Sequence, residues 1–251
     1  MTASFVDQLL GSRNRAEKEN PGKPNFSDGG NRPSVAIASH MLSTLGINRE
    51  VKLQSEESSG ALFEELVQFD IESALKLRRP NVVWQVRRDA SGLSEFAQYS
   101  HLGELNRLVQ ADQSNTLAIA LGRDYEVAPD VTVGLPREEG GLPFLHATVS
   151  CKLTLRSDRA QNAKTESAVL TRHRKGRMPH VVAVTAEPLP SRIASLAQGT
   201  GDLDSVYHVA LAELVEAVAA EGTKNQVSIL DLLVASDRLR DYNGLLVTIS
   251  R

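Results

Sequence analysis

Alternating polar and apolar residues over 145–155, LHATVSCKLTL, predict a β-strand. The polar positions that share one face are His146, Thr148, Ser150, Lys152 and Thr154. This period of two residues indicates a strand with one buried side. Ser150 and Lys152 should therefore project together, whereas the Cys151 side chain enters the core and its backbone carbonyl can face the polar side.

A helix with a marked start follows this strand. Ser157 is a good N-cap, Asp158 suits the first turn, and helix-forming residues continue through Leu170. Arg156 and Arg159 flank this predicted N-terminus. The pattern thus predicts a strand, a short turn and an arginine-flanked helix in succession.

The hydrophobic pattern predicts four further elements. Apolar residues at helical spacing over 60–77 put Glu64 on or beside a core-facing helix. Residues 82–86 and 181–185 are typical of buried strands, and 204–220 of an amphipathic helix that ends at Glu221 and Gly222. These elements favour the α/β class.

Length and composition are consistent with one domain over residues 1–251. A chain of 251 residues that is 41% hydrophobic can bury a full core. Its least globular stretch is 11–34, rich in Asn, Gly, Ser, Pro and charged residues. We expect this stretch to be a flexible arm that orders on DNA, with a merely flexible N-terminus as the alternative.

Composition also excludes several classes of protein. The single cysteine, Cys151, forbids an internal disulfide and fits a reducing cytosol, so a cytoplasmic location is expected. The six histidines show no zinc-ligand spacing, and neither a Walker A loop nor a dinucleotide-binding fingerprint is present. No apolar stretch approaches a membrane span and no signal peptide is recognisable, so we expect no membrane partner.

Positive charge is concentrated in one segment. Residues 152–177 hold eight Lys or Arg against Asp158 and Glu166, which gives +6, while the whole chain has a net charge of −3 and the remainder therefore −9. Such a segment suits a phosphate backbone, which the whole chain would repel. Arginines at a helix N-terminus can also donate to guanine O6 and N7, and an aspartate can accept from cytosine N4. The alternative is a capped surface helix with a solvated basic face.

Acidic residues before and after the predicted strand complete a candidate catalytic set. Phosphodiester hydrolysis needs an activated water and stabilisation of phosphoryl charge, which a hard divalent cation on carboxylate and carbonyl oxygens supplies. Asp130 and Glu166 are candidate acids, and the Cys151 carbonyl is a candidate third ligand for Mg²⁺. Lys152 would lie beside the scissile phosphate. Taken singly, a Pro-Asp pair before a strand is usually a turn, and a lysine on a strand face is usually solvated.

A longer run of residues makes the pattern specific. SCKLTLRSDRAQNAKTE from Ser150, followed by HRKGRMPHVVAVTAEPLPSRIASLAQGTGDLDSVYHVAL, resembles the NgoMIV-like type II restriction endonucleases, which cut at CCGG-centred sites. The match is densest over 121–214 and recurs in SSGALFE (58–64) and NFSDGGN (25–31). The resemblance implies the PD-(D/E)xK nuclease fold, a mixed central β-sheet flanked by helices.

The resemblance also implies an active centre. In this subgroup a serine, here Ser150, replaces the acid that usually precedes the lysine, and the missing carboxylate comes from the helix, here Glu166. Together with Asp130 and Lys152 these residues would form the centre, with Glu64 as an accessory acid.

Base-reading positions follow from the same resemblance. Arg156, Asp158 and Arg159 match readers of the inner CCGG. Asp28 and Arg192 match readers of the flanking base pair in NgoMIV-like enzymes, whose site is GCCGGC.

Three departures bear on flanking-base preference and assembly. Gly30 stands where a relative has a serine near the outer base pair, and Glu57 where it has a glutamine. A carboxylate facing DNA phosphates is costly unless it is turned away or paired. Residues 134–141, GLPREEGG, form a short turn where the relative carries a longer excursion associated with its tetramer.

The sequence therefore predicts a Mg²⁺-dependent type II restriction endonuclease that cuts double-stranded DNA at a palindrome with a CCGG core, GCCGGC by resemblance. A palindrome read by one helix per half requires twofold-related copies, so we expect a homodimer, with a tetramer as the alternative. A cognate DNA methyltransferase is expected in the same host.

Two other functions compete with this prediction. One is a sequence-specific DNA-binding protein that does not cut, against which the intact Asp130, Lys152 and Glu166 argue. The other is a repair or junction-resolving nuclease on the same fold. The arginine-rich match at 156–159 argues against it, because structure-selective nucleases need no base readers.

Overall fold

A six-stranded sheet runs through the middle of the molecule, in the order β3-β4-β5-β6-β7-β8. The computed structural model describes residues 2–14, 16, 20–51, 56–88, 92–122, 126–199, 201 and 203–251, and of residues 56–58 the backbone alone. The strands are β3 (Gln85–Arg87), β4 (Val131–Leu135), β5 (Phe144–Lys152), β6 (His180–Thr185), β7 (Ser205–His208) and β8 (Leu239–Asp241).

The sheet is mixed, which confirms the predicted fold class. β3, β4 and β5 pair antiparallel, whereas β5, β6, β7 and β8 pair parallel. Parallel neighbours need a crossover connection, which is usually helical. The crossovers here are α6 (Ser157–His173), α7 (Pro190–Ala197), and α8 (Leu211–Glu221) with α9 (Lys224–Ala235).

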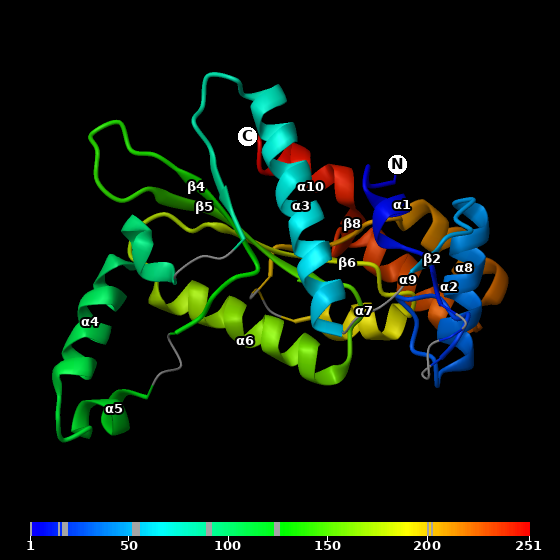
Figure 1. The fold of residues 1–251 in the computed structure, drawn as a ribbon, viewed down its shortest axis with the longest axis horizontal. Helices are drawn as coiled ribbons and strands as arrows, with labels where there is room; N and C mark the ends of the chain where they lie inside the picture. Colours follow the sequence, from blue (N-terminus) through cyan, green and yellow to red (C-terminus); the bar gives the residue numbers. More distant parts are fainter. Residues whose placement is uncertain are drawn as a thin grey trace.

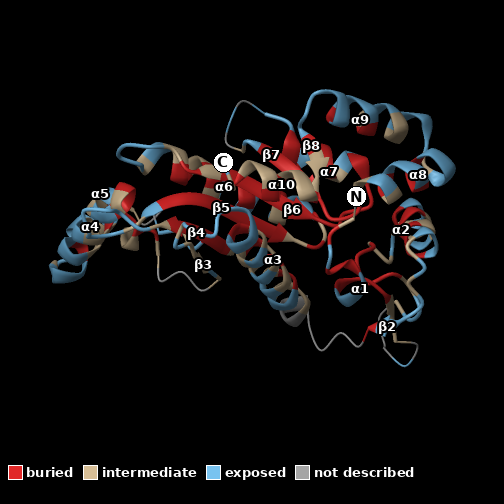
Figure 2. Ribbon diagram, turned by 90° about the horizontal axis from the view of Figure 1, so that it is seen from above, coloured by how far each residue is buried: buried red, intermediate tan, exposed pale blue. Residues whose placement is uncertain are grey.

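Helices cover both faces of this sheet (Figure 1). α3 (Glu56–Arg78) and α10 (Tyr242–Thr248) pack together on one face, and α6 runs along the opposite face. Phe63, Val67 and Ile71 of α3 are fully buried, as is Val149 of β5. Figure 2 shows this burial continuing along the central strands. The N-terminal ends of α3 and α6 lie near each other, on opposite faces of the sheet (Figure 1).

The remaining elements are peripheral. They are α1 (Val6–Leu9), β1 (Ser12–Arg13), α2 (Arg32–Thr44), β2 (Glu50–Val51), the 3₁₀ turns η1 (Leu93–Glu95) and η2 (Ala97–Tyr99), α4 (Ser100–Ala111) and α5 (Thr116–Leu121). β1 and β2 form a small parallel sheet of their own. α4 and α5 stand away from the central sheet in both views, and α5 buries no residue (Figures 1 and 2).

The strand predicted over 145–155 exists, but the prediction that one of its sides is exposed is wrong. β5 ends at Lys152, and on the face expected to be solvated Thr148 is 2% and Ser150 9% exposed. β5 is a central strand with helices over both faces, so its polar face is covered as fully as its apolar one.

Helix predictions are confirmed at 60–77 and 157–170, with one correction at a cap. α6 continues to His173, and its N-cap is Arg156, whose side chain makes no capping hydrogen bond. Ser157 is therefore the first helical residue and not the cap. The strand predicted at 181–185 is confirmed as β6.

Two other sequence predictions are partly wrong. In place of a buried strand over 82–86, the short strand β3 lies at the sheet edge, and Val83 is 73% exposed. In place of one helix over 204–220, Ser205–His208 forms β7 and α8 starts at Leu211. The run SVYH is rich in strand-forming residues and pairs within the buried sheet, and these features outweigh the helical period of the longer segment 204–220.

The segment 11–34 contains residues that are anchored to the body of the protein. Phe26 is fully buried, and Asn25 accepts a hydrogen bond from the Gly11 amide at 3.2 Å and donates one to the Leu9 carbonyl at 2.9 Å. Whether the segment orders on DNA, and whether 1–251 behaves as one domain, stay predictions. Within the described residues, no helix is both long and apolar enough to cross a membrane.

Candidate active site

One carboxylate oxygen gathers three predicted site residues. Asp130 precedes β4, and because β4 and β5 pair with Val131 opposite Val149, it lies beside the end of β5. Its Oδ2 accepts from Lys152 Nζ at 2.7 Å, from the Cys151 amide at 2.7 Å and from Ser150 Oγ at 3.3 Å. Ser150 and Lys152 thus project together, as the alternation of the strand requires.

Lys152 and Asp130 form a largely buried ion pair, with 18% and 17% of their side chains exposed. Burial lowers the pKa of Lys152, but the charge and the hydrogen bond of Asp130 outweigh it, and the pKa is raised overall. Lys152 therefore keeps its positive charge at neutral pH, although it is largely removed from water.

Two further carboxylates share this electrostatic environment. Burial raises the pKa of Glu166 on α6, the Lys152 ammonium opposes the rise, and the Asp130 carboxylate adds to it. Burial also raises the pKa of Glu64 on α3, where Asp130 again adds and Lys152 opposes. The negative charges thus repel one another around a single ammonium, and a cation among them would relieve that repulsion.

The thiol of Cys151 takes no part in this charge cluster. Burial raises the pKa of Cys151 well above its usual value, and the carboxylate of Asp130 raises it further. A neutral, buried thiol is a poor ligand for a hard cation. The predicted contribution of Cys151 is its backbone carbonyl.

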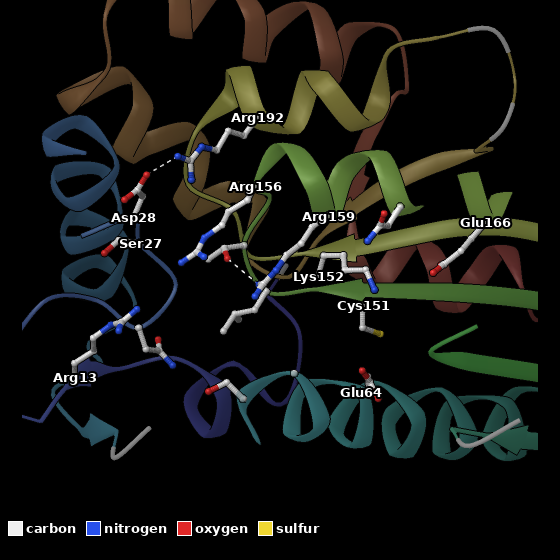
Figure 3. Close-up of a pocket in the computed structure, with 16 residues that line it drawn as sticks. Arg13, Ser27, Asp28, Glu64, Cys151, Lys152, Arg156, Arg159, Glu166 and Arg192 are labelled. Atoms are coloured by element: carbon white, nitrogen blue, oxygen red, sulfur yellow. Dashed lines mark hydrogen bonds and ion pairs between the residues drawn. The ribbon is translucent and has the colours of Figure 1, made fainter. Parts of the chain in front are cut away.

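These residues line a cleft of about 240 Å³ (Figure 3). The predicted site residues among its lining are Asp28, Glu64, Cys151, Lys152, Arg156, Arg159, Glu166 and Arg192. Asp130 is outside that lining and is joined to it by its ion pair with Lys152. The cleft thus joins the acidic cluster to the arginines at the start of α6.

Two of the three predicted inner readers reach this cleft. Arg156 and Arg159 point into it in Figure 3, and Arg159 Nη1 donates to Thr154 Oγ1 at 3.3 Å. Asp158 is exposed on the first turn of α6 and does not line the cleft. The structure therefore brings the arginines to the acids and leaves Asp158 on the outer side of the turn.

Asp28 and Arg192 meet although 164 positions separate them. Arg192 Nη2 lies 2.5 Å from Asp28 Oδ2, and this hydrogen bond is the main reason the pKa of Asp28 is lowered. The amide of Gly30 donates to Asp28 Oδ1 at 3.1 Å, and a Cβ on Gly30 would lie 3.6 Å from that oxygen, an ordinary contact. A serine would thus fit at Gly30. The side chain of Glu57 lies outside the described part of the chain.

Sequence reasoning missed several residues of the cleft. Arg13, Thr154 and Asn162 line it, and the buried Nε of Arg13 has no hydrogen-bond partner among the described residues. The available signal for Arg13 was a basic residue within a segment expected to contact DNA. That Arg13 and residues of α6 line the same cleft depends on the tertiary structure.

Comparison with known proteins identifies the family. A model of the NgoMIV restriction enzyme family matches residues 5–139 and 135–250. The type II restriction enzyme NgoMIV of Neisseria gonorrhoeae is 36% identical over 269 residues, which span 94% of this chain and 91% of that enzyme. The chain belongs to the NgoMIV restriction enzyme family. This membership makes it a type II restriction endonuclease and confirms the resemblance drawn from the sequence.

A solved structure is a weaker match. The crystal structure of the pre-specific restriction endonuclease BsaWI in complex with DNA is 13% identical to the chain, with a TM-score of 0.33 over 61% of this chain and 52% of that one. A similarity of this extent adds nothing to the family assignment.

The family model matches the chain in two segments that overlap at a connection between two strands. Its two segments meet at residues 135–139, where β4 ends and the connection to β5 begins. This is where the sequence predicts a turn shorter than the excursion of NgoMIV-like enzymes.

Proposed function

We propose that this chain makes Mg²⁺-dependent double-strand cuts in DNA at a palindromic site with a CCGG core, GCCGGC in full. The observation that carries the proposal is the shared cleft. Lys152, held by Asp130, lines the same cavity as Arg156 and Arg159 at the α6 N-terminus. Hydrolytic and base-reading groups thus meet within the reach of one DNA segment.

The donor set fits Mg²⁺. Among the described residues, no three His, Cys, Asp or Glu side chains are grouped closely enough to hold a metal by themselves. Mg²⁺ keeps several waters and needs few protein ligands, so Asp130 and Glu166 with the Cys151 carbonyl would suffice, and Glu64 would be accessory. When bound, the ion would lower the pKa of a water and stabilise phosphoryl charge.

The chain's own residues would do the rest. The ammonium of Lys152, charged at neutral pH, would orient the attacking water and offset charge on the scissile phosphate. Ser150 would fix the carboxylate of Asp130 by donating its hydroxyl hydrogen. Because metal ligands must be deprotonated, the raised pKa values of Glu64 and Glu166 favour metal binding at neutral over acidic pH.

Base reading is proposed for five residues in two groups. Arg156 and Arg159 would donate to guanine in the inner CCGG, and Asp158 would accept from cytosine once DNA reaches the outer side of the turn. Arg192 and Asp28 would read the flanking pair. Their ion pair, formed without DNA, holds one donor and one acceptor side by side.

Digestion of a plasmid of known sequence, with purified protein and Mg²⁺, tests the proposal. We expect double-strand breaks at GCCGGC, located by sequencing the ends, and no breaks without Mg²⁺. Binding without cleavage would support the DNA-binding alternative. Cleavage of branched but not linear DNA would support a junction nuclease.

We expect a homodimer in solution. Each half of a palindrome needs its own α6 N-terminus, and a twofold axis along the DNA supplies the second copy. The connection from β4 to β5 covers residues 136–143, a short segment compared with the excursion expected in a tetrameric relative. Light scattering of the DNA-free protein measures the mass, and plasmids with one site and with two sites measure coupling. A tetramer that cuts two sites in concert contradicts this prediction.

A cytoplasmic location and a cognate methyltransferase belong to the same proposal. The enzyme would act on DNA that enters the cell, so the host's own sites need protection. Methylation of GCCGGC that leaves cleavage unchanged would count against this partner.

A further inference from the structure

A buried carboxylate lies where two base-reading segments meet. Glu187 follows β6, and its side chain is 1% exposed. β5 and β6 are parallel, with Lys152 paired to Thr185, so the chain leaving β6 runs beside the chain leaving β5. This register brings Glu187 next to Leu155, one residue before Arg156.

Both oxygens of Glu187 are used. Oε2 accepts from the Leu155 amide at 2.7 Å, and Oε1 accepts from the Leu189 amide at 3.1 Å. Leu189 is the N-cap of α7, the helix that carries Arg192, and Arg192 Nη1 lies 4.0 Å from Glu187 Oε2. One carboxylate thus joins the turn before α6, the start of α7 and a guanidinium that lines the cleft.

An ionisable group at this depth is costly unless it is hydrogen-bonded. Burial raises the pKa of Glu187 to about 7, against the Leu155 amide and Arg192, which lower it. Its neighbours Ala186 and Leu189 are buried apolar residues, and an apolar side chain in place of Glu187 would leave the Leu155 and Leu189 amides without this acceptor. The partners that Glu187 holds indicate why a carboxylate stands here.

Resting on the proposed function, we propose that Glu187 is a positioning residue for base recognition, which holds the Arg156 turn and Arg192 in fixed relative positions without touching DNA. Loss of the carboxylate would loosen both segments together. Discrimination would then fall at inner and flanking base pairs alike. The carboxylate of Glu187 bonds the Leu155 and Leu189 amides, whereas Lys152 is held by Asp130, so the ion pair of Asp130 and Lys152 would keep its geometry.

Glu187→Gln tests this role with little change of volume. The amide keeps one acceptor oxygen but turns an NH₂ group toward a backbone N–H. The discrimination ratio is the cleavage rate of the cognate site divided by that of a site altered at one base pair. We expect this ratio to fall about tenfold or more at inner and at flanking positions, as for a lost charged hydrogen bond. The fall should come from the cognate site, because a site altered at one base pair already lacks the full set of base contacts, and its single-turnover rate should stay within about threefold of the wild-type rate.

Ser167→Ala is the matched control. Ser167 is a buried polar residue of α6 whose hydroxyl donates to the Ala163 carbonyl at 2.7 Å, away from the turn before that helix. This variant should change the melting temperature at most and leave the discrimination ratio unchanged. The same pattern in Glu187→Gln would make Glu187 a structural residue and overturn the inference.

Wild-type protein, assayed in parallel, separates the two proposals. Failure of wild type to cut GCCGGC refutes the proposed function, whereas a wild type that discriminates no better than Glu187→Gln refutes the positioning role alone. If the glutamine variant does not fold, Glu187→Asp, which keeps the charge but shortens the reach, carries the same measurement. If neither variant folds, Glu187 is a residue of the fold and the inference is wrong.

Discussion

Lys152→Ala is expected to slow DNA cleavage by about 10²–10³-fold while sequence-specific binding remains. The substitution removes the ammonium that Asp130 holds at 2.7 Å and that would face the scissile phosphate. Loss of one group that stabilises transition-state charge typically slows a reaction by about 10²–10³-fold. Single-turnover cleavage of a duplex containing GCCGGC, with Mg²⁺ at saturation, measures the loss.

Binding of the same duplex in Ca²⁺ separates chemistry from folding. Ca²⁺ accepts oxygen ligands with looser geometry, and by resemblance to such enzymes it is expected to support binding without hydrolysis. Lys152→Ala should keep its preference for the cognate duplex under these conditions. Asp130→Asn should behave in the same way, since it removes a proposed metal ligand. Normal cutting by Lys152→Ala would show that the active centre lies elsewhere.

Arg159→Ala is expected to reduce discrimination at one base pair of CCGG. Arg159 lines the cleft from the first turn of α6, with Nη1 held by Thr154. A bidentate arginine contact with guanine contributes about 1–3 kcal/mol of discrimination, or roughly 5–150-fold. Competition between the cognate duplex and duplexes altered at single positions measures the effect at each base pair.

Arg172→Ala is the matched control for this substitution. Arg172 lies in the last turn of the same helix, is exposed, and does not line the cleft. A contact with phosphate alone contributes equally on every sequence, so any loss of affinity in Arg172→Ala should be uniform. If Arg159→Ala also weakened specific and random DNA equally, Arg159 would be a phosphate contact and not a base reader.

The sequence by itself determined the elements whose signals are local. Alternation over 145–155 places Ser150 and Lys152 on one face because successive side chains of a strand point to opposite sides. The positive segment 152–177 places a net charge of +6 over α6 within a chain of net charge −3. Family membership also rests on sequence, because a run of matching residues needs no coordinates.

Only the tertiary structure decided how distant segments meet. Periodicity shows that β5 is a strand, but its central place in the sheet buries the face that alternation predicts to be solvated. The run SVYH, predicted as part of a helix over 204–220, forms β7 because its strand-forming residues pair within the buried sheet. The buried polar face of β5 has a plain cause, since solvent exposure depends on what packs against an element.

The contacts of the candidate site divide in the same way, into those that follow from local sequence and those that depend on the fold. The Asp130 to Lys152 contact follows from two adjacent strands, so local pattern and resemblance together could anticipate it. The pairing of Asp28 with Arg192 and the position of Glu187 beside Leu155 depend on sheet order and strand register. These are set by the packing of the whole chain, and no short stretch of sequence encodes them.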